Sequence, residues 1–81
     1  APEFFYFYDK KQTLSEILEL DSRAEVMRRS KDAERAADLL GTSFQSRLKG
    51  LYERLGIKVP KRYSKLSVPS DDAPMGSSEE E

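Results

Sequence analysis

Apolar side chains recur every three or four residues in the middle of the chain, which is the spacing of one face of an α-helix. The stripe runs from Phe44 to Leu55, and Thr42 or Ser43 is suited to cap its start. Gly56 follows the last apolar position and favours a left-handed stop, after which Ile57 is apolar again. The pattern therefore predicts a helix that begins at Thr42 or Ser43 and ends at Leu55.

A shorter helix is predicted directly before it, over residues 33–40. Asp32 can accept hydrogen bonds from the free amides at its start, and Gly41 can take a left-handed conformation at its end. Ala36 and Ala37 permit a close approach by a neighbouring helix. Two helices that meet at a glycine corner have the shape of a helix-turn-helix hairpin.

A third helix is predicted over residues 14–29. Thr13 and Glu16 have the spacing of a capping box. Asp21 interrupts the apolar stripe of this helix, and we expect it to pair with Arg47 or another cation. The three helices are expected to enclose a core of Leu14, Ile17, Leu18, Met27, Ala36, Ala37, Leu40, Phe44, Leu48, Leu51 and Leu55.

The N-terminal residues 1–12 are expected to form an extended arm, because a run of aromatic residues has strong strand preference. The run has two interpretations. It packs over the protein's own helices, or it anchors the chain on a partner. The candidate partner-binding residues are Phe4, Phe5, Tyr6, Phe7 and Tyr8.

Charge divides the C-terminal third into two parts, although the whole chain carries only -1. Residues 47–66 carry seven cations and one carboxylate, a net charge of +6, and residues 67–81 carry five carboxylates and no cation. The basic extension of residues 58–66 has three interpretations: it runs along a phosphate backbone, it lies over an acidic protein surface, or it is a solvated segment. Residues 67–81 are rich in serine, proline and carboxylates and are predicted to be disordered.

These patterns predict an all-α protein with a small three-helix domain over residues 13–57. A chain of 81 residues buries a modest core, so a dimer mate or a larger assembly is expected to stabilise it, through residues 4–8 and the first helix. It has no cysteine and no histidine, which removes thiolate metal sites and the usual general base. No cofactor and no enzymatic activity are expected.

No apolar run is long enough to cross a bilayer, so the sequence predicts a soluble protein in a reducing compartment, cytoplasmic if bacterial. The chain begins with Ala1 rather than methionine, which fits either a fragment or a processed N-terminus.

Residues 35–41 read Arg-Ala-Ala-Asp-Leu-Leu-Gly and are followed by a polar cap and a helix that ends Leu-Gly-Ile. This arrangement resembles the C-terminal helix-turn-helix of the Fis-type family of bacterial DNA-binding domains. The ending of residues 51–57 also looks like the end of the recognition helix in LuxR-like regulators. The resemblance implies a DNA-binding module of a transcription regulator, with the second hairpin helix in the major groove of duplex DNA.

On that hypothesis Gln45 pairs with an adenine edge and Lys49 reaches a guanine or a phosphate. The full set of candidate nucleic-acid contacts is Ser43, Gln45, Ser46, Arg47, Lys49, Arg54, Lys58, Lys61 and Arg62. The alternative is a non-enzymatic helical subunit of a larger assembly, anchored by the aromatic N-terminus.

Overall fold

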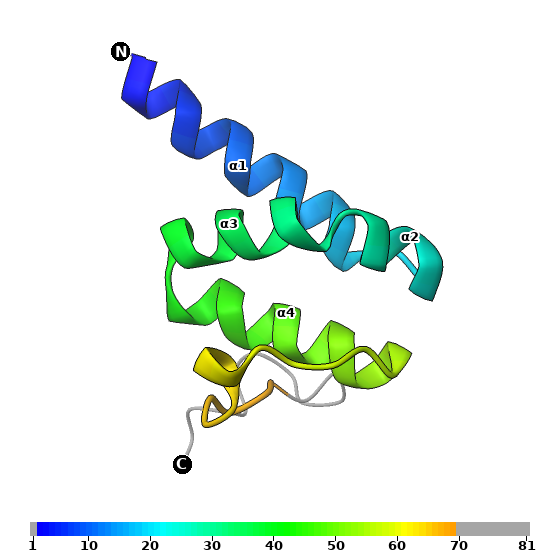
Figure 1. Cartoon of the computed structure of the whole chain (residues 1–81). Helices are drawn as coiled ribbons and strands as arrows, with labels where there is room; N and C mark the ends of the chain where they lie inside the picture. The colour runs from blue at the N-terminus through cyan, green and yellow to red at the C-terminus, as the bar shows by residue number, and fades with distance from the viewer. Residues whose placement is uncertain (1, 70–81) are drawn as a thin grey trace.

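The computed structural model describes residues 2–69, and this part of the chain is a layered stack of helices (Figure 1). Its elements are α1 (Pro2–Leu18), α2 (Arg23–Arg28), α3 (Ser30–Leu40), α4 (Thr42–Leu55) and the short 3-10 helix η1 (Lys61–Tyr63). Residues 2–69 contain no strand, so the predicted all-α class is confirmed. Most of the predicted acidic tail, from residue 70 onward, lies outside the described residues.

α3 is the central helix, with α1 packed on one side and α4 on the other (Figure 1). Its inner side chains are the small residues Ala33, Ala36 and Ala37, which are fully buried. Small side chains at a contact shorten the distance between helix axes, so both neighbours approach α3 closely. The core is completed by Leu14, Ile17, Val26, Leu48, Leu51, Tyr52, Ile57 and Tyr63.

The N-terminal arm is helical, so the expected extended conformation of residues 1–12 is wrong from residue 2 onward. α1 begins at Pro2, where the missing amide hydrogen of proline costs no helical hydrogen bond. Aromatic residues cost only about 0.5 kcal/mol each in a helix, and no second strand exists in residues 2–69 to pair with an extended arm. Thr13 consequently lies inside α1, and the predicted capping box does not start a helix.

The predicted continuous helix of residues 14–29 is also wrong, because the chain turns after Leu18 and α2 starts only at Arg23. The Ser22 hydroxyl caps α2 by accepting a hydrogen bond from the Glu25 amide at 3.2 Å. A continuous helix would have carried Asp21 on the core side, where an unpaired carboxylate is costly. The break leaves the Asp21 side chain 92% exposed, 3.4 Å from an Arg54 nitrogen.

The hairpin of α3 and α4 forms as predicted around Gly41, with α3 beginning three residues earlier, at Ser30. Asp32 therefore lies in the first turn of α3 instead of capping it. Gly56 ends α4 in the left-handed conformation, with φ +70°. The Ile57 amide then donates to the Tyr52 carbonyl at 2.8 Å, which buries Ile57 and turns the chain back along α4.

Ten of the eleven predicted core residues lie in the core or packed against it. The exception is Met27, which is 46% exposed, while its neighbour Val26 is fully buried. The break after Leu18 resets the helical phase, so the inward positions of α2 differ from those of a continued α1.

Candidate functional site

The basic segment after Ile57 is part of the fold, because residues 58–69 run back along α4 (Figure 1). The Tyr63 side chain is 1% exposed and belongs to the core. From α4, the Lys49 ammonium group donates hydrogen bonds to the carbonyls of Ser64 and Leu66, both at 2.8 Å. Lys49 therefore ties the returning segment to the helix and is itself only 9% exposed.

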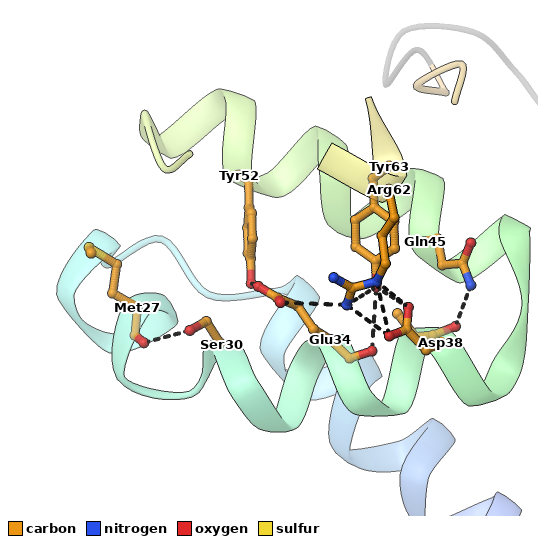
Figure 2. Close-up of polar contacts among 9 residues, drawn as sticks. Met27, Ser30, Glu34, Asp38, Gln45, Tyr52, Arg62 and Tyr63 are labelled. Atoms are coloured by element: carbon orange, nitrogen blue, oxygen red, sulfur yellow. Dashed lines mark hydrogen bonds and ion pairs between the residues drawn. The ribbon is translucent and has the colours of Figure 1, made fainter. Parts of the chain in front are cut away.

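Arg62 and Tyr63 bind the outer face of α3 through Asp38 (Figure 2). An Arg62 terminal nitrogen lies 2.7 Å from an Asp38 carboxylate oxygen, and the Arg62 Nε lies 3.2 Å from the same oxygen. The Tyr63 hydroxyl donates to the other Asp38 oxygen. Partial burial raises the pKa of the Asp38 carboxyl, but the hydrogen bonds from Arg62 and Tyr63 outweigh this and hold it below its usual range.

A second part of the same polar cluster joins the two helices of the hairpin (Figure 2). The Tyr52 hydroxyl donates to the Glu34 carboxylate at 2.6 Å, and burial together with this bond raises the pKa of Tyr52 well above its ordinary value. At the other end of the hairpin the Gln45 amide donates to the Ala37 carbonyl at 3.2 Å. The end of α3 thus contacts the start of α4, and an early residue of α3 contacts a late residue of α4, so the two helices run antiparallel.

This cluster is a structural network, since no buried side-chain nitrogen or oxygen within residues 2–69 lacks a hydrogen-bond partner. The hydrogen bonds from Arg62 and Tyr63 lower the pKa of the Asp38 carboxyl and so favour its charged form. A general acid at neutral pH needs a raised carboxyl pKa instead.

The opposite side of α4 borders an open groove of about 970 Å³, which we call the α4 groove. The end of α1 and residues 67–69 form its two walls. Its lining consists of Leu18, Glu19, Ser43, Ser46, Arg47, Gly50, Leu51, Arg54, Ser67, Val68 and Pro69. Four of the predicted nucleic-acid contacts, Ser43, Ser46, Arg47 and Arg54, therefore come together there.

The other predicted nucleic-acid contacts are dispersed. Gln45, Lys49 and Arg62 bind groups of the chain itself, so the expectation that Gln45 and Lys49 lie on an outward reading face is not met. Lys58 and Lys61 are exposed but do not line the α4 groove. The Arg47 guanidinium lies over the Phe44 ring, 5.1 Å from its centre.

The aromatic end of α1, residues 5–8, is the largest exposed apolar feature of the described chain. Phe5, Tyr6, Phe7 and Tyr8 are each between 45% and 65% exposed. Successive helical residues point about 100° apart, so four of them surround the helix on all sides. This end of α1 projects beyond the layer of α3 and α4 (Figure 1), and Phe4 lies in the same helical turn.

Within residues 2–69 there is no group of histidine, cysteine, aspartate and glutamate residues arranged to hold a metal ion. No helix in this part is long and apolar enough to span a membrane. Comparison with protein-family models, curated proteins and solved structures finds no match to this chain.

Two features differ from the predictions: the aromatic run is helical, and the basic extension binds groups of the chain itself. The signal for the first was Pro2 followed by a stretch without glycine or a second proline, which suits a helix start. The signal for the second was Tyr63 among cations, since a lone aromatic residue in a polar segment gains most by entering the core.

Proposed function

We propose that this chain is a non-enzymatic interaction module that docks onto a larger protein through the aromatic end of α1. The observation that carries the proposal is the ring of Phe5, Tyr6, Phe7 and Tyr8 around a projecting helix. A helix that is apolar on all sides normally lies in a buried environment. Aromatic side chains also dominate the energy of protein interfaces.

The way α1 is held supports the same proposal. Its second half is fixed to the body by Leu14 and Ile17, which are fully buried. The aromatic end is therefore presented on a helix that is already formed, so little conformational entropy is lost on docking. Lys10 lies over the Tyr6 ring at 5.2 Å and keeps a charge at the base of the projection.

Helix-in-pocket docking fits this geometry, with aromatic side chains as anchors. Tyr6 and Tyr8 each carry a hydroxyl that can pair with polar groups at the rim of a pocket.

The DNA hypothesis stays a prediction, and three observations weigh against it. Lys49 and Arg62, two of its main cations, are committed to bonds within the chain. The two helices of a DNA-binding helix-turn-helix meet at about 90–120°, whereas α3 and α4 run antiparallel. In addition, α4 packs against both α3 and the returning segment, whereas a recognition helix must protrude to enter the major groove.

The docking proposal is tested by affinity purification from cells of the source with three forms of the full chain. The wild type is compared with Tyr6→Ser/Phe7→Ser/Tyr8→Ser and with Lys58→Ala/Lys61→Ala as a matched surface control. We expect a discrete protein that is retained by the wild type and by the lysine control and lost from the serine variant. Equal retention by all three forms would contradict docking through the aromatic end.

DNA binding is tested separately by fluorescence anisotropy of labelled random duplex DNA at low salt. The proposal predicts no salt-dependent binding by the wild type, because few cations on one face remain available for phosphates. Binding that falls steeply with salt and disappears in Arg47→Ala/Arg54→Ala would instead support the DNA hypothesis.

A further inference from the structure

We infer that the α4 groove binds the chain's own C-terminal acidic segment, residues 70–81. This inference concerns a different face from the aromatic end of α1 and stands independently of the proposed function. It rests on the lining of the groove, on the point where the described chain ends, and on the chemistry of the segment that follows.

The groove combines two cations, Arg47 and Arg54, and one carboxylate, Glu19, with an apolar floor. Arg47 and Arg54 project from α4 and are exposed, while Leu18 and Leu51 lie between its walls. The carboxylate nearest to Arg54 is Asp21, at 3.4 Å across an exposed pair. An exposed ion pair of this kind contributes little free energy, so Arg54 can exchange Asp21 for another carboxylate at small cost.

The chain itself leads into this groove. Residues 67–69 form one of its walls, and two contacts with α4 hold that wall in place. Lys49 binds the carbonyls of Ser64 and Leu66, and the Val68 side chain lies so close to Gly50 that a Cβ there would be 2.9 Å away. The described chain therefore ends at Pro69, which lines the groove.

The sequence that follows has the complementary chemistry. Residues 70–81 carry five carboxylates and no cation, and Asp71 and Asp72 follow Pro69 most closely in sequence. Met75 is the largest apolar side chain among them and is suited to the floor of Leu18 and Leu51. The segment thus pairs carboxylates with the two arginines and an apolar group with the apolar floor.

Because the segment belongs to the same chain as the groove, even a low affinity is enough for substantial occupancy. A short tethered segment has an effective concentration on the order of millimolar near its attachment point. A dissociation constant of about 1 mM would then give roughly half occupancy. While the segment occupies the groove, an acidic segment of another protein has to displace it in order to bind Arg47 and Arg54.

Paramagnetic relaxation in the full chain tests this inference. Because the chain has no cysteine, Ser78→Cys provides a single attachment point for a nitroxide label. We expect broadening of the backbone amides of Ser43, Ser46 and Arg47, and we expect salt to reverse it, since the Debye length falls from about 10 Å at 0.1 M to 3 Å at 1 M.

Two variants complete the test. Arg47→Gln/Arg54→Gln, and separately a segment with its five carboxylates changed to amides, should each lose the broadening while keeping a dispersed amide spectrum. Lys58→Gln/Lys61→Gln is the control and should keep it. Absence of broadening would overturn the inference. So would broadening that persists at high salt and in both variants, or broadening that is lost in the lysine control.

Discussion

The basic block of residues 47–66 and the aromatic end of α1 both differ from what their compositions suggest. Cations normally lie in solvent, yet Lys49 and Arg62 bind carbonyls and a carboxylate of the chain itself. Aromatic side chains normally enter the core, yet Tyr6, Phe7 and Tyr8 are exposed on a projecting helix. The fold thus uses two cations of the basic block internally and exposes the aromatic side chains at the end of α1.

The contrast shows how a small chain completes its core. Three helices around the alanines of α3 bury little apolar surface, and a chain of this size is marginal. The returning segment adds Tyr63 to the core beside Ile57. Lys49 binds two carbonyls of this segment, and Arg62 of the segment binds Asp38 of α3. Lys49 and Arg62 are thereby used in folding, whereas the aromatic side chains at the end of α1 stay exposed.

The largest expected effect on stability is the difference between substitutions of a buried and an exposed tyrosine. Tyr63→Ala should lower the free energy of unfolding by about 3 kcal/mol, because it removes a fully buried aromatic ring and leaves a cavity. Tyr8→Ala, at an exposed position, should change it by less than about 0.5 kcal/mol. Urea denaturation measures both. Equal losses would mean that the aromatic end also packs on the body.

A smaller effect is expected for the buried cation. Lys49→Met keeps the apolar stem but removes the hydrogen bonds to Ser64 and Leu66, and we expect a loss of about 1–2 kcal/mol. Lys58→Met is the matched control, since Lys58 is exposed and should be neutral. If the two variants have the same urea midpoint, Lys49 does not anchor the returning segment.

The polar cluster predicts loss of stability at both ends of the pH range. The pKa of Asp38 is lowered, so its contribution is present above its ordinary pKa of 3.8 and is lost as the pH falls below that value. The pKa of Tyr52 is raised, so its contribution is present below its ordinary pKa of 10.0 and is lost as the pH rises above it. Urea midpoints measured across pH should therefore fall on both sides.

Tyr52→Phe sharpens this test. It should reduce the alkaline loss and leave the acidic loss in place, because Asp38 keeps its contacts with Arg62 and Tyr63. An unchanged alkaline limb would assign that loss to other groups.

The smallest effect on stability is expected for the docking surface itself. Tyr6→Ser/Phe7→Ser/Tyr8→Ser should leave the urea midpoint within error of the wild type, since these side chains are exposed. A large shift would show that the serine variant loses its partner by unfolding, and the docking experiment would then need single substitutions.

Much of the fold could be predicted from the sequence, and the predictions that are wrong have physical causes. Helix α4 was predictable because its apolar period and its stop at Gly56 agree, although the predicted cap by Thr42 or Ser43 is wrong: Gly41 takes the N-cap position and no side chain caps the helix. The break between Leu18 and Arg23 was not predictable. Capping by Ser22 competes with continuation of the helix, and the apolar period does not reveal the small free-energy difference between the two.

The candidate site was harder to predict. Composition identifies residues 47–66 as basic, but only tertiary structure decides whether a cation faces solvent or a carbonyl. Lys49 and Arg47 lie two positions apart on α4, and one binds the returning segment while the other lines the α4 groove.

The most direct test of the central claim is site-specific photocrosslinking in cells of the source, with benzophenone side chains placed in turn at Phe7 and Arg47 of the full chain. We expect a discrete protein adduct from position 7 and no nucleic-acid adduct from position 47. A nucleic-acid adduct at position 47, with no protein adduct at position 7, would contradict it.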